Sequence, residues 1–534
     1  MATQFSKLTC AASLTGLTRL DAVQALIGFA ALAPCLQGRA AMPMWLMLAL
    51  GLPILRVLLV SSYRRRVLAW LGQLWDSLET YPVPNSRPPW LAVVMLVLLP
   101  YGFLLLAREY AFQTADTRPA VLTAAELVTH GNSNLTEFAK AYSERRLYAD
   151  NGELPHFAMN TPAGVHSGYP SGMAPFALPV IAAARLLHAD LNDIGVHARL
   201  EKWTAAWVAA SCLGLFFLIA LHLASPKPAF AASLLLAVGS VMFSTIGQAL
   251  WQHGGVIFWG LLAFWLEFRQ AQHASKWAIA VQGIACAMLI ACRLSSALFV
   301  VAFVMWMLLR SPRRACAVAA CGVLAFIPWA LWYYSIYGTP LGPSTMQLAG
   351  HNWSALNLHG LAGVVVSPSR GVLVYQPWLV LAGLALVPPI RRRMAGSRAP
   401  CPSGWAWFCA AACLAHLAVI GSWSCWWGGY GWGSRLAADV VPLGALLCVQ
   451  PIAVLWRSVN GRCIVLTFAV LGFLLHVPAV YLKQDLWNSC PPVGERLERL
   501  WSWSEAPFLF SESRHRRDLP NYKSPASRER ERPE

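Results

Sequence analysis

Long apolar runs separated by short polar segments follow one another along most of this chain. Runs of about 20 apolar residues, the length that a helix needs to cross a bilayer core of roughly 30 Å, recur as far as residue 482. The runs are continuously apolar rather than alternating, which predicts helices and excludes membrane-spanning strands. We expect about thirteen spans, at residues 22–38, 43–61, 89–107, 202–223, 229–248, 254–269, 277–292, 295–310, 315–336, 372–390, 404–422, 437–456 and 463–482.

The longest interruption of this pattern is residues 108–201. Its first part, AELVTHGNSNLTEFAKAYSERR, has helical spacing and few apolar residues. The later part, GYPSGMAPFALPVIAAARLL, is apolar, but it is short and broken by three prolines, which indicates a juxtamembrane or re-entrant helix rather than a span. Irregular backbone at that depth must be buried in protein or line a wet cavity. We therefore expect this segment to pack over the helix bundle and to roof a site.

Three regions follow from the same pattern. Residues 1–88 form an N-terminal extension with two spans, because the first run has a weak basic flank and reads as a retained helix rather than a cleaved signal. Residues 89–482 form the transmembrane core, including the external segment 108–201. Residues 483–534 form a basic tail.

Composition and charge agree with an all-α polytopic membrane protein. Hydrophobic residues make up 57% of the chain and charged residues only 12%, about half of the charged share usual in soluble domains. The net charge of +17 does not indicate nucleic-acid binding, since Lys and Arg gather in short connectors as the positive-inside rule expects. This places the N-terminus in the cytoplasm and residues 108–201, 337–371, 422–436 and the tail outside. The alternative is a cytoplasmic tail, which would follow from one span fewer or more, since basic residues beyond the last span also bias topology. The connectors expected in the cytoplasm carry Arg64 to Arg66, Lys227, Arg269, Lys276, Arg310, Arg313, Arg314, Arg391 to Arg393, Arg457 and Arg462.

Most of the 14 cysteines lie inside apolar runs, where they act as small buried hydrophobes. No CxxC pair occurs, which argues against a zinc or redox site. Cys425 and Cys490 both fall outside the expected membrane spans. The sequence leaves open whether these two form a disulfide.

Asp116, just beyond the third expected span, is the first candidate for chemistry. An aspartate in a loop is most often a solvated charge or a helix N-cap, and Asp116 could cap a helix that starts at Pro119. Glu109 has the same ordinary explanations. The residue type alone therefore does not decide between capping and catalysis.

Four stretches favour a catalytic role for Asp116: ADTRPAVLTAAELVTHGNSNLTEF, SPSRGVLVYQPW, WSCWWGGYGWGSRLAADVVP and LERLWSWSEAPFL. Their order, over roughly residues 89–510, resembles the GT-C superfamily of membrane glycosyltransferases. That superfamily includes protein O-mannosyltransferases, the aminoarabinose transferase of lipid A and many bacterial proteins. In its pattern an acidic residue follows the first core span, and a helix and a Gly-rich turn come next.

The resemblance implies a GT-C-like fold and transfer of a hexose or pentose, with inversion, from a polyprenyl-phosphate donor to an external acceptor. Such a reaction needs a base for the acceptor and cations for the departing lipid phosphate. Asp116 is the expected general base. Arg435, Arg370 and Arg293 are the expected phosphate ligands, since the planar guanidinium binds phosphate oxygens in a bidentate manner.

Further residues are weaker candidates for binding the sugar or the acceptor. They are Trp427, Trp432, His253, His166 and Tyr169. His253 could equally be a histidine at a helix end. Many of the 25 tryptophans are expected in the interfacial belt, although aromatic faces also stack on sugars.

The chain departs from the superfamily pattern in two ways that bear on metal use and on the fold. Asp116 is followed by Thr117 where a second acidic residue is usual, and no DxD triplet occurs in the loop. We therefore expect no required metal or other cofactor. Two expected spans also precede the core.

Two other kinds of protein share this general appearance. One is a transporter or flippase for a lipid-linked saccharide, but such proteins often show inverted repeats and charges at the membrane midplane, which this sequence does not. The other is a polymerase or ligase of surface glycans. The leading expectation is a transferase of the bacterial inner membrane that serves the cell envelope, with a glycan, lipid or protein acceptor.

Overall fold

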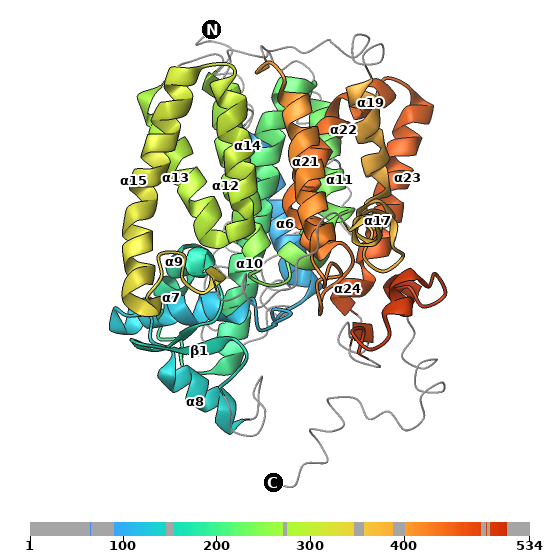
Figure 1. Cartoon of the computed structure of the whole chain (residues 1–534). Helices are drawn as coiled ribbons and strands as arrows, with labels where there is room; N and C mark the ends of the chain where they lie inside the picture. The colour runs from blue at the N-terminus through green and yellow to red at the C-terminus, as the bar shows by residue number, and fades with distance from the viewer. Residues whose placement is uncertain are drawn as a thin grey trace.

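Helices that run side by side form the body of the molecule, and a polar cap covers one end of them (Figure 1). The computed structural model describes residues 63, 65, 90–145, 154–270, 275–345, 357–387, 401–481, 487–488 and 492–509. The two spans expected at 22–38 and 43–61, the connector with Arg391 to Arg393, Cys490 and the end of the basic tail lie outside these residues. The principal helices are α6 (Trp90–Ala107), α10 (Ile194–Leu223), α11 (Pro226–Val238), α12 (Gln252–Gln270), α13 (Lys276–Cys292), α14 (Ala297–Leu308), α15 (Pro312–Tyr337), α17 (Leu358–Val366), α21 (Trp405–Ser422), α22 (Val441–Leu455) and α23 (Val459–His476).

The protein is an integral membrane protein. Within the described residues, five helical stretches are long and apolar enough to cross a membrane by length and composition, and several shorter apolar helices accompany them. In the most apolar part of α10, 83% of the residues are buried, against 17% for α15 and 28% for α23. α10 is therefore the central helix, packed against α6, α11 and α12. The exposed faces of α15 and α23 carry leucine, valine and isoleucine, as expected for faces that meet lipid. The five stretches are Ile194–Leu223, Pro312–Tyr337, Trp405–Ser422, Arg435–Leu455 and Val459–Tyr481.

Two expected spans differ from the observed helices. The run 229–248 is not one helix, since α11 ends at Val238 and a separate π-helical turn, η3 (Met242–Ile246), follows. The run 372–390 is divided into α18 (Val372–Tyr375), η5 (Pro377–Leu381) and α19 (Ala382–Leu386). Pro377 stands at the start of η5, and because proline lacks the N–H needed inside a helix, the apolar run bends there.

The basic connectors lie at one end of the bundle. His253 near the start of α12, Arg293 at the end of α13 and Asp439 just before α22 contact one another, so these helix ends lie together. The opposite ends of the same helices lie at the top of Figure 1, where the connectors hold Arg269, Lys276, Arg310, Arg313, Arg314, Arg457 and Arg462. The expected one-sided distribution is confirmed for these connectors. Their cytoplasmic location stays a prediction.

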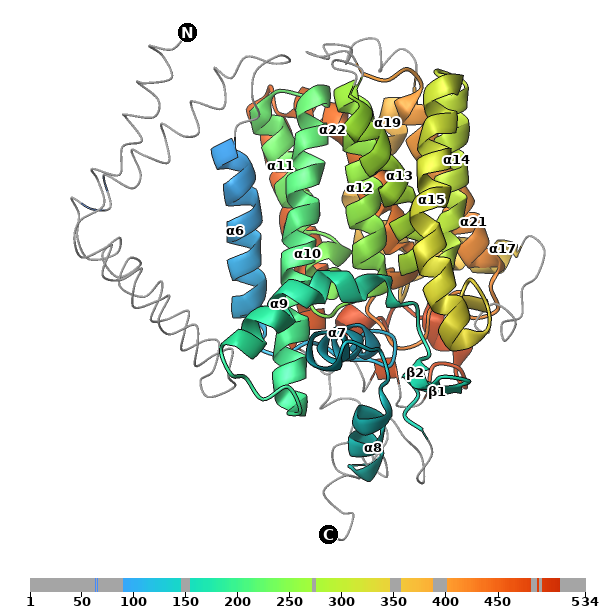
Figure 2. The same cartoon turned by 90° about the vertical axis from the view of Figure 1, so that its left-hand side faces the viewer.

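The other end of the bundle is covered by residues 108–145 and 154–193. Figure 2 shows α7 (Arg118–His130) and α9 (Ala174–Leu186) lying across this end, with α8 (Thr136–Glu144) below them. The polar part is helical as expected and breaks at Gly131, which ends α7 with φ of 71°. The proline-containing part forms η2 (Ser171–Met173) and the 13-residue α9, which fits a helix at the membrane surface.

The expectation of an all-α chain misses one feature. Strands β1 (Ala158–Thr161) and β2 (Gly164–Ser167) form an antiparallel hairpin within the cap, with Ala158 opposite Ser167 and Thr161 opposite Gly164. Four-residue strands give too short an alternation to be distinguished from a loop by their sequence pattern. The hairpin reverses the direction of the chain just before Tyr169.

Candidate functional site

Asp116 lies on an extended segment that is fixed to the bundle at the capped end. The Ala111 N–H donates to the Ala198 carbonyl at 3.0 Å, and the Phe112 N–H donates to the Gln248 carbonyl at 3.0 Å. A turn between Thr114 and Thr117 then places Asp116 just before α7. Thr117 occupies the N-cap position of α7, so the alternative in which Asp116 caps this helix is wrong.

Buried charged residues on α10 contact this segment and the turn before α12. The Gln113 side chain donates to Glu201 at 2.7 Å, and the Leu250 N–H donates to the same carboxylate at 3.1 Å. The neighbouring Lys202 donates to the Gly247 carbonyl and to the Gln248 side chain, both at 2.6 Å. Glu201 and Lys202 are fully buried, and such groups are tolerated only when hydrogen-bonded. They join the Asp116 segment to the turn that precedes α12.

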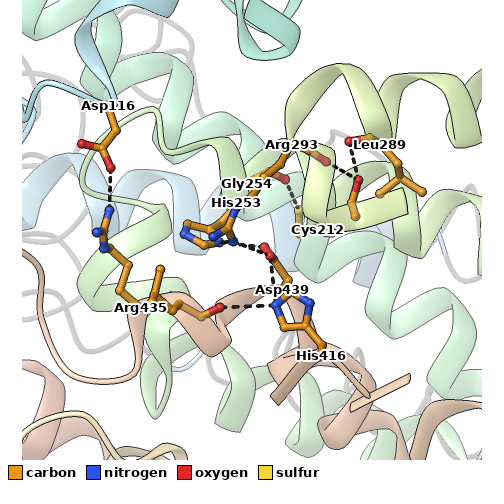
Figure 3. Close-up of polar contacts among 11 residues, drawn as sticks. Asp116, Cys212, His253, Gly254, Leu289, Arg293, His416, Arg435 and Asp439 are labelled. Atoms are coloured by element: carbon orange, nitrogen blue, oxygen red, sulfur yellow. Dashed lines mark hydrogen bonds and ion pairs between the residues drawn. The ribbon is translucent and has the colours of Figure 1, made fainter. Parts of the chain in front are cut away.

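Arg435 is the direct partner of Asp116. Its Nη1 donates to Asp116 Oδ2 at 2.8 Å, and its Nη2 donates to the Gly428 carbonyl. The guanidinium lies 4.4 Å from the ring centre of Trp251. The Asp116 side chain is 31% exposed and that of Arg435 is 11% exposed, so the carboxylate is both oriented and accessible. Figure 3 shows this pair beside His253.

A second group of charges surrounds Asp439, which the sequence analysis did not select. Arg293 Nη1 donates to Asp439 Oδ2 at 2.8 Å, and His253 Nδ1 lies 2.7 Å from Asp439 Oδ1. His416 Nε2 approaches Asp439 Oδ2 at 3.3 Å from α21. The Asp439 side chain is 4% exposed. Figure 3 shows His253 between Arg435 and Asp439. The missed signal was an aspartate four residues after Arg435 at the start of an apolar run, where a charge needs a partner.

Arg370 is buried and holds the glycine-rich loop that follows Trp423. Its Nε donates to the Trp427 carbonyl at 2.8 Å, and its Nη2 donates to the Gly429 carbonyl at 3.1 Å and to Asn488 Oδ1 at 2.6 Å. Burial lowers the pKa of the Arg370 guanidinium to about 10. These contacts fix the loop that supplies Gly428 to Arg435. The phosphate role of Arg370 stays a prediction.

The two selected tryptophans have different surroundings. Trp427 is partly exposed, and its carbonyl accepts the bond from Arg370. Trp432 is buried, donates its indole N–H to the Leu475 carbonyl at 3.2 Å and packs edge-on against Tyr375. Trp427 therefore offers the more accessible ring for a sugar, while the visible contacts of Trp432 are structural. Neither role in sugar binding is tested.

His166 and Tyr169 belong to the cap. His166 is buried in β2, with Nδ1 2.8 Å from the Ser133 carbonyl, so it joins the hairpin to the turn before α8. Tyr169 lies within electrostatic range of Asp116. Burial, and then the negative charge of Asp116, raise the pKa of the Tyr169 hydroxyl. The hydroxyl therefore stays protonated near neutral pH and can donate a hydrogen bond.

An apolar cavity adjoins the Asp439 group. It is small, with a cavity volume of about 60 Å³, and lies between α12, α13, α14, α21 and α22. Its walls are mainly aliphatic side chains and Phe299, and His416 and Asp439 are its charged or titratable lining residues. The cavity thus brings apolar walls up to the charged end of the bundle.

Within the residues that the structure describes, no group of three or more His, Cys, Asp or Glu side chains is placed to hold a metal ion. The Asp439 group includes two histidines, but the Arg293 guanidinium already occupies one carboxylate oxygen. Independence from metal stays a prediction. The possible disulfide between Cys425 and Cys490 stays a prediction, since Cys490 lies outside the described residues.

No protein-family model and no curated protein matches the chain. Among solved structures, the chain is similar to the Archaeoglobus fulgidus oligosaccharyltransferase tethered with an acceptor peptide, with 11% identity, a TM-score of 0.46, and 79% of this chain and 59% of that chain covered. It is also similar to the oligosaccharyltransferase AglB from the same organism in complex with an inhibitory peptide and a dolichol-phosphate, with 11% identity, a TM-score of 0.38, and 78% and 60% covered. The chain thus spans about three fifths of the length of these proteins. Since both TM-scores are below 0.5, the likeness by itself establishes neither a shared fold nor a shared activity.

Proposed function

We propose that this protein is a membrane glycosyltransferase of GT-C type, which moves a sugar from a polyprenyl-phosphate donor to an acceptor at the capped end of the bundle. One observation carries the proposal. The accessible carboxylate of Asp116 is held by Arg435 at 2.8 Å, beside a second arginine group and an apolar cavity that extends between the helices. This reaction needs a base and cations at one place, and the small apolar cavity borders the same charged end of the bundle.

The chemical step uses Asp116 as the general base. An acceptor hydroxyl or amine attacks the anomeric carbon of the donor, and the bond from that carbon to the phosphate oxygen breaks with inversion. The acceptor proton passes to Asp116, and the polyprenyl phosphate leaves with the electron pair. Asp116 Oδ2 accepts from Arg435, while among the described residues no partner is seen for Oδ1. That oxygen is therefore the one that receives the proton.

Arg293 is the better placed of the remaining arginines to bind the departing phosphate. Its side chain is 21% exposed, whereas Arg370 is 4% exposed. Only Nη1 of Arg293 is engaged among the described residues, so its other N–H groups are free for an anion. Charge-assisted hydrogen bonds of this kind are roughly twice as strong as neutral ones. Tyr169 and Trp427 complete the proposed site as contacts for the sugar or the acceptor.

The direct test is to incubate the purified protein with a labelled polyprenyl-phosphate sugar in detergent and in sealed vesicles. Transfer of label to water or to an added acceptor, with release of polyprenyl phosphate, is the expected result. Movement of the intact donor across the vesicle membrane without cleavage would instead identify a flippase. Extension of a lipid-linked glycan in the same assay would identify a polymerase.

Asp116→Asn should abolish transfer while the protein is still made and folded. Loss of a general base lowers kcat by about 10²- to 10⁴-fold, and Asn keeps the size of the side chain. The matched control is Glu109→Gln, since Glu109 lies on the same segment and pairs with Arg199 at the same distance of 2.8 Å. Turnover measured for both variants should fall for Asp116→Asn alone. Full activity of Asp116→Asn would refute the assignment of the base.

A further inference from the structure

The group around Asp439 joins four separate elements at the inner edge of the proposed site. His253 comes from α12, Arg293 from the end of α13, His416 from α21 and Asp439 from η6 (Arg435–Val440). The carboxylate receives two contacts below 3 Å, from His253 at 2.7 Å and Arg293 at 2.8 Å. A carboxylate that is 4% exposed is strongly destabilising unless it is paired in this way.

Asp439 shares the short helix η6 with Arg435, four residues before it. Arg435 holds Asp116, and Asp439 holds Arg293. One end of η6 is thus tied to the proposed base and the other to the proposed phosphate ligand. Of these two arginines, only Arg293 contacts Asp439 directly among the described residues.

Only one edge of the Arg293 guanidinium is used by this group. Nη1 meets Asp439 and His253, and for the part of the chain that the structure describes no partner is seen for Nε or Nη2. His253 Nδ1 cannot both donate to Asp439 at 2.7 Å and accept from Arg293, so the bond that holds Nη1 is the one to Asp439 at 2.8 Å. Because a guanidinium is planar, this bond restricts the directions of the remaining N–H bonds. The Asp439 contact therefore orients the free edge of Arg293 before any anion arrives.

We propose that Asp439 is a positioning residue that orients Arg293 for the phosphate of the lipid-linked donor. The inference rests on the proposed function for the identity of the anion. It assigns Asp439 no contact with the substrate. His253 steadies the other oxygen of the carboxylate, and His416 contacts the carboxylate without a contact to Arg293 in the described residues.

The sign of the effect distinguishes positioning from charge balance. If Asp439 only neutralised Arg293, its removal would leave an extra positive charge and tighten the binding of an anion. If it orients Arg293, its removal frees a long side chain to adopt other rotamers, and binding weakens. Asp439→Asn, which keeps the shape of the side chain and removes its charge, makes the two cases predict opposite changes in affinity.

The experiment measures binding of a synthetic polyprenyl monophosphate to the full-length protein in nanodiscs, together with KM and kcat for transfer. Asp439→Asn should weaken binding roughly 10- to 100-fold, the range found when a group that orients a ligand-binding residue is removed. Arg293→Met should weaken it at least as much, and the double variant should be no worse than Arg293→Met, because the two residues act through one contact.

Glu267→Gln is the matched control for a general loss of stability. Glu267 lies near the opposite end of α12 from His253, is fully buried and pairs with both Arg310 and Arg314. Its variant should lower the thermal midpoint and leave the affinity for polyprenyl monophosphate unchanged. Equal loss of affinity in Glu267→Gln and Asp439→Asn, or tighter binding by Asp439→Asn, would overturn the role of Asp439.

The outcome separates this inference from the proposed function. Wild-type binding of polyprenyl monophosphate without any sugar transfer, combined with weakened binding by Asp439→Asn, would remove the transferase proposal and keep the role of Asp439. Wild-type transfer with unchanged donor affinity and KM in Asp439→Asn would do the reverse.

Discussion

At the scale of single residues, the proposed site consists of charges that are each fixed by a specific partner. Asp116 and Arg435 are 319 positions apart in the sequence and 2.8 Å apart in the structure. Arg435 also donates to the Gly428 carbonyl and lies over Trp251. Its role is therefore geometric as well as electrostatic, since it sets the direction of the Asp116 carboxylate.

Arg435→Lys tests that geometric role. Lysine keeps the positive charge but is a point charge without the planar fork that reaches Asp116 and Gly428 together. We expect kcat to fall about 10- to 100-fold, because misplacing a catalytic group by about 1 Å has an effect of that size. The comparison variant is Arg496→Lys, at a pair with Glu498 in which both side chains are more than half exposed. Wild-type turnover in Arg435→Lys would show that only its charge matters.

At the scale of elements, the position of the cap depends on a close contact between η2 and the end of α13. A Cβ atom added to Gly172 would lie 2.4 Å from the Cys292 nitrogen and 2.5 Å from the Ala291 carbonyl oxygen. Both are backbone atoms, which cannot move aside as a flexible side chain can. This contact holds the chain just after Tyr169 against the bundle. Arg293 is the next residue after Cys292, so it lies beside the same contact.

Gly172→Ala should therefore displace the cap from the bundle. Forcing an extra methyl group into a close-packed contact typically destabilises by about 1–3 kcal/mol, so the thermal midpoint and the turnover should both fall. The control is Gly102→Ala in α6, where the added methyl would meet no atom within 4 Å and alanine is the better helix former. Thermal unfolding of both variants in detergent checks the prediction, and equal midpoints would contradict the importance of this contact.

At the scale of the whole molecule, the two ends of the bundle differ in chemistry. The basic connectors are at one end and the cap is at the other. Asp116 lies just before α7 of the cap and pairs with Arg435, and Arg293 follows the end of α13 on the same side. The basic end includes the Glu267 group with Arg310 and Arg314. The positive-inside rule assigns that end to the cytoplasm, which would place the proposed site outside.

Epitope tags test this orientation in the full-length chain. A short tag inserted after Asn132, in the turn between α7 and α8, should be reached by antibody from the outer face of the membrane. A tag after Ser311, in the connector between α14 and α15, should be reached only after the membrane is permeabilised. Detection of both tags on the same side would contradict the arrangement of the helices, and reversed sides would contradict the proposed location of the site.

The hydrophobic pattern was enough to predict the membrane class, most helices and the one-sided distribution of the basic connectors. Backbone groups in lipid must be satisfied within a helix, so a long apolar run leaves little choice of structure. The sequence also indicated Asp116, Arg435, Arg293 and His253 one by one. The packing of the helices was needed to show which of these charges meet, that Asp439 joins them, and that Arg370 is occupied with backbone carbonyls. Contacts between residues hundreds of positions apart depend on how helices pack, and a local hydrophobic pattern carries no record of that packing.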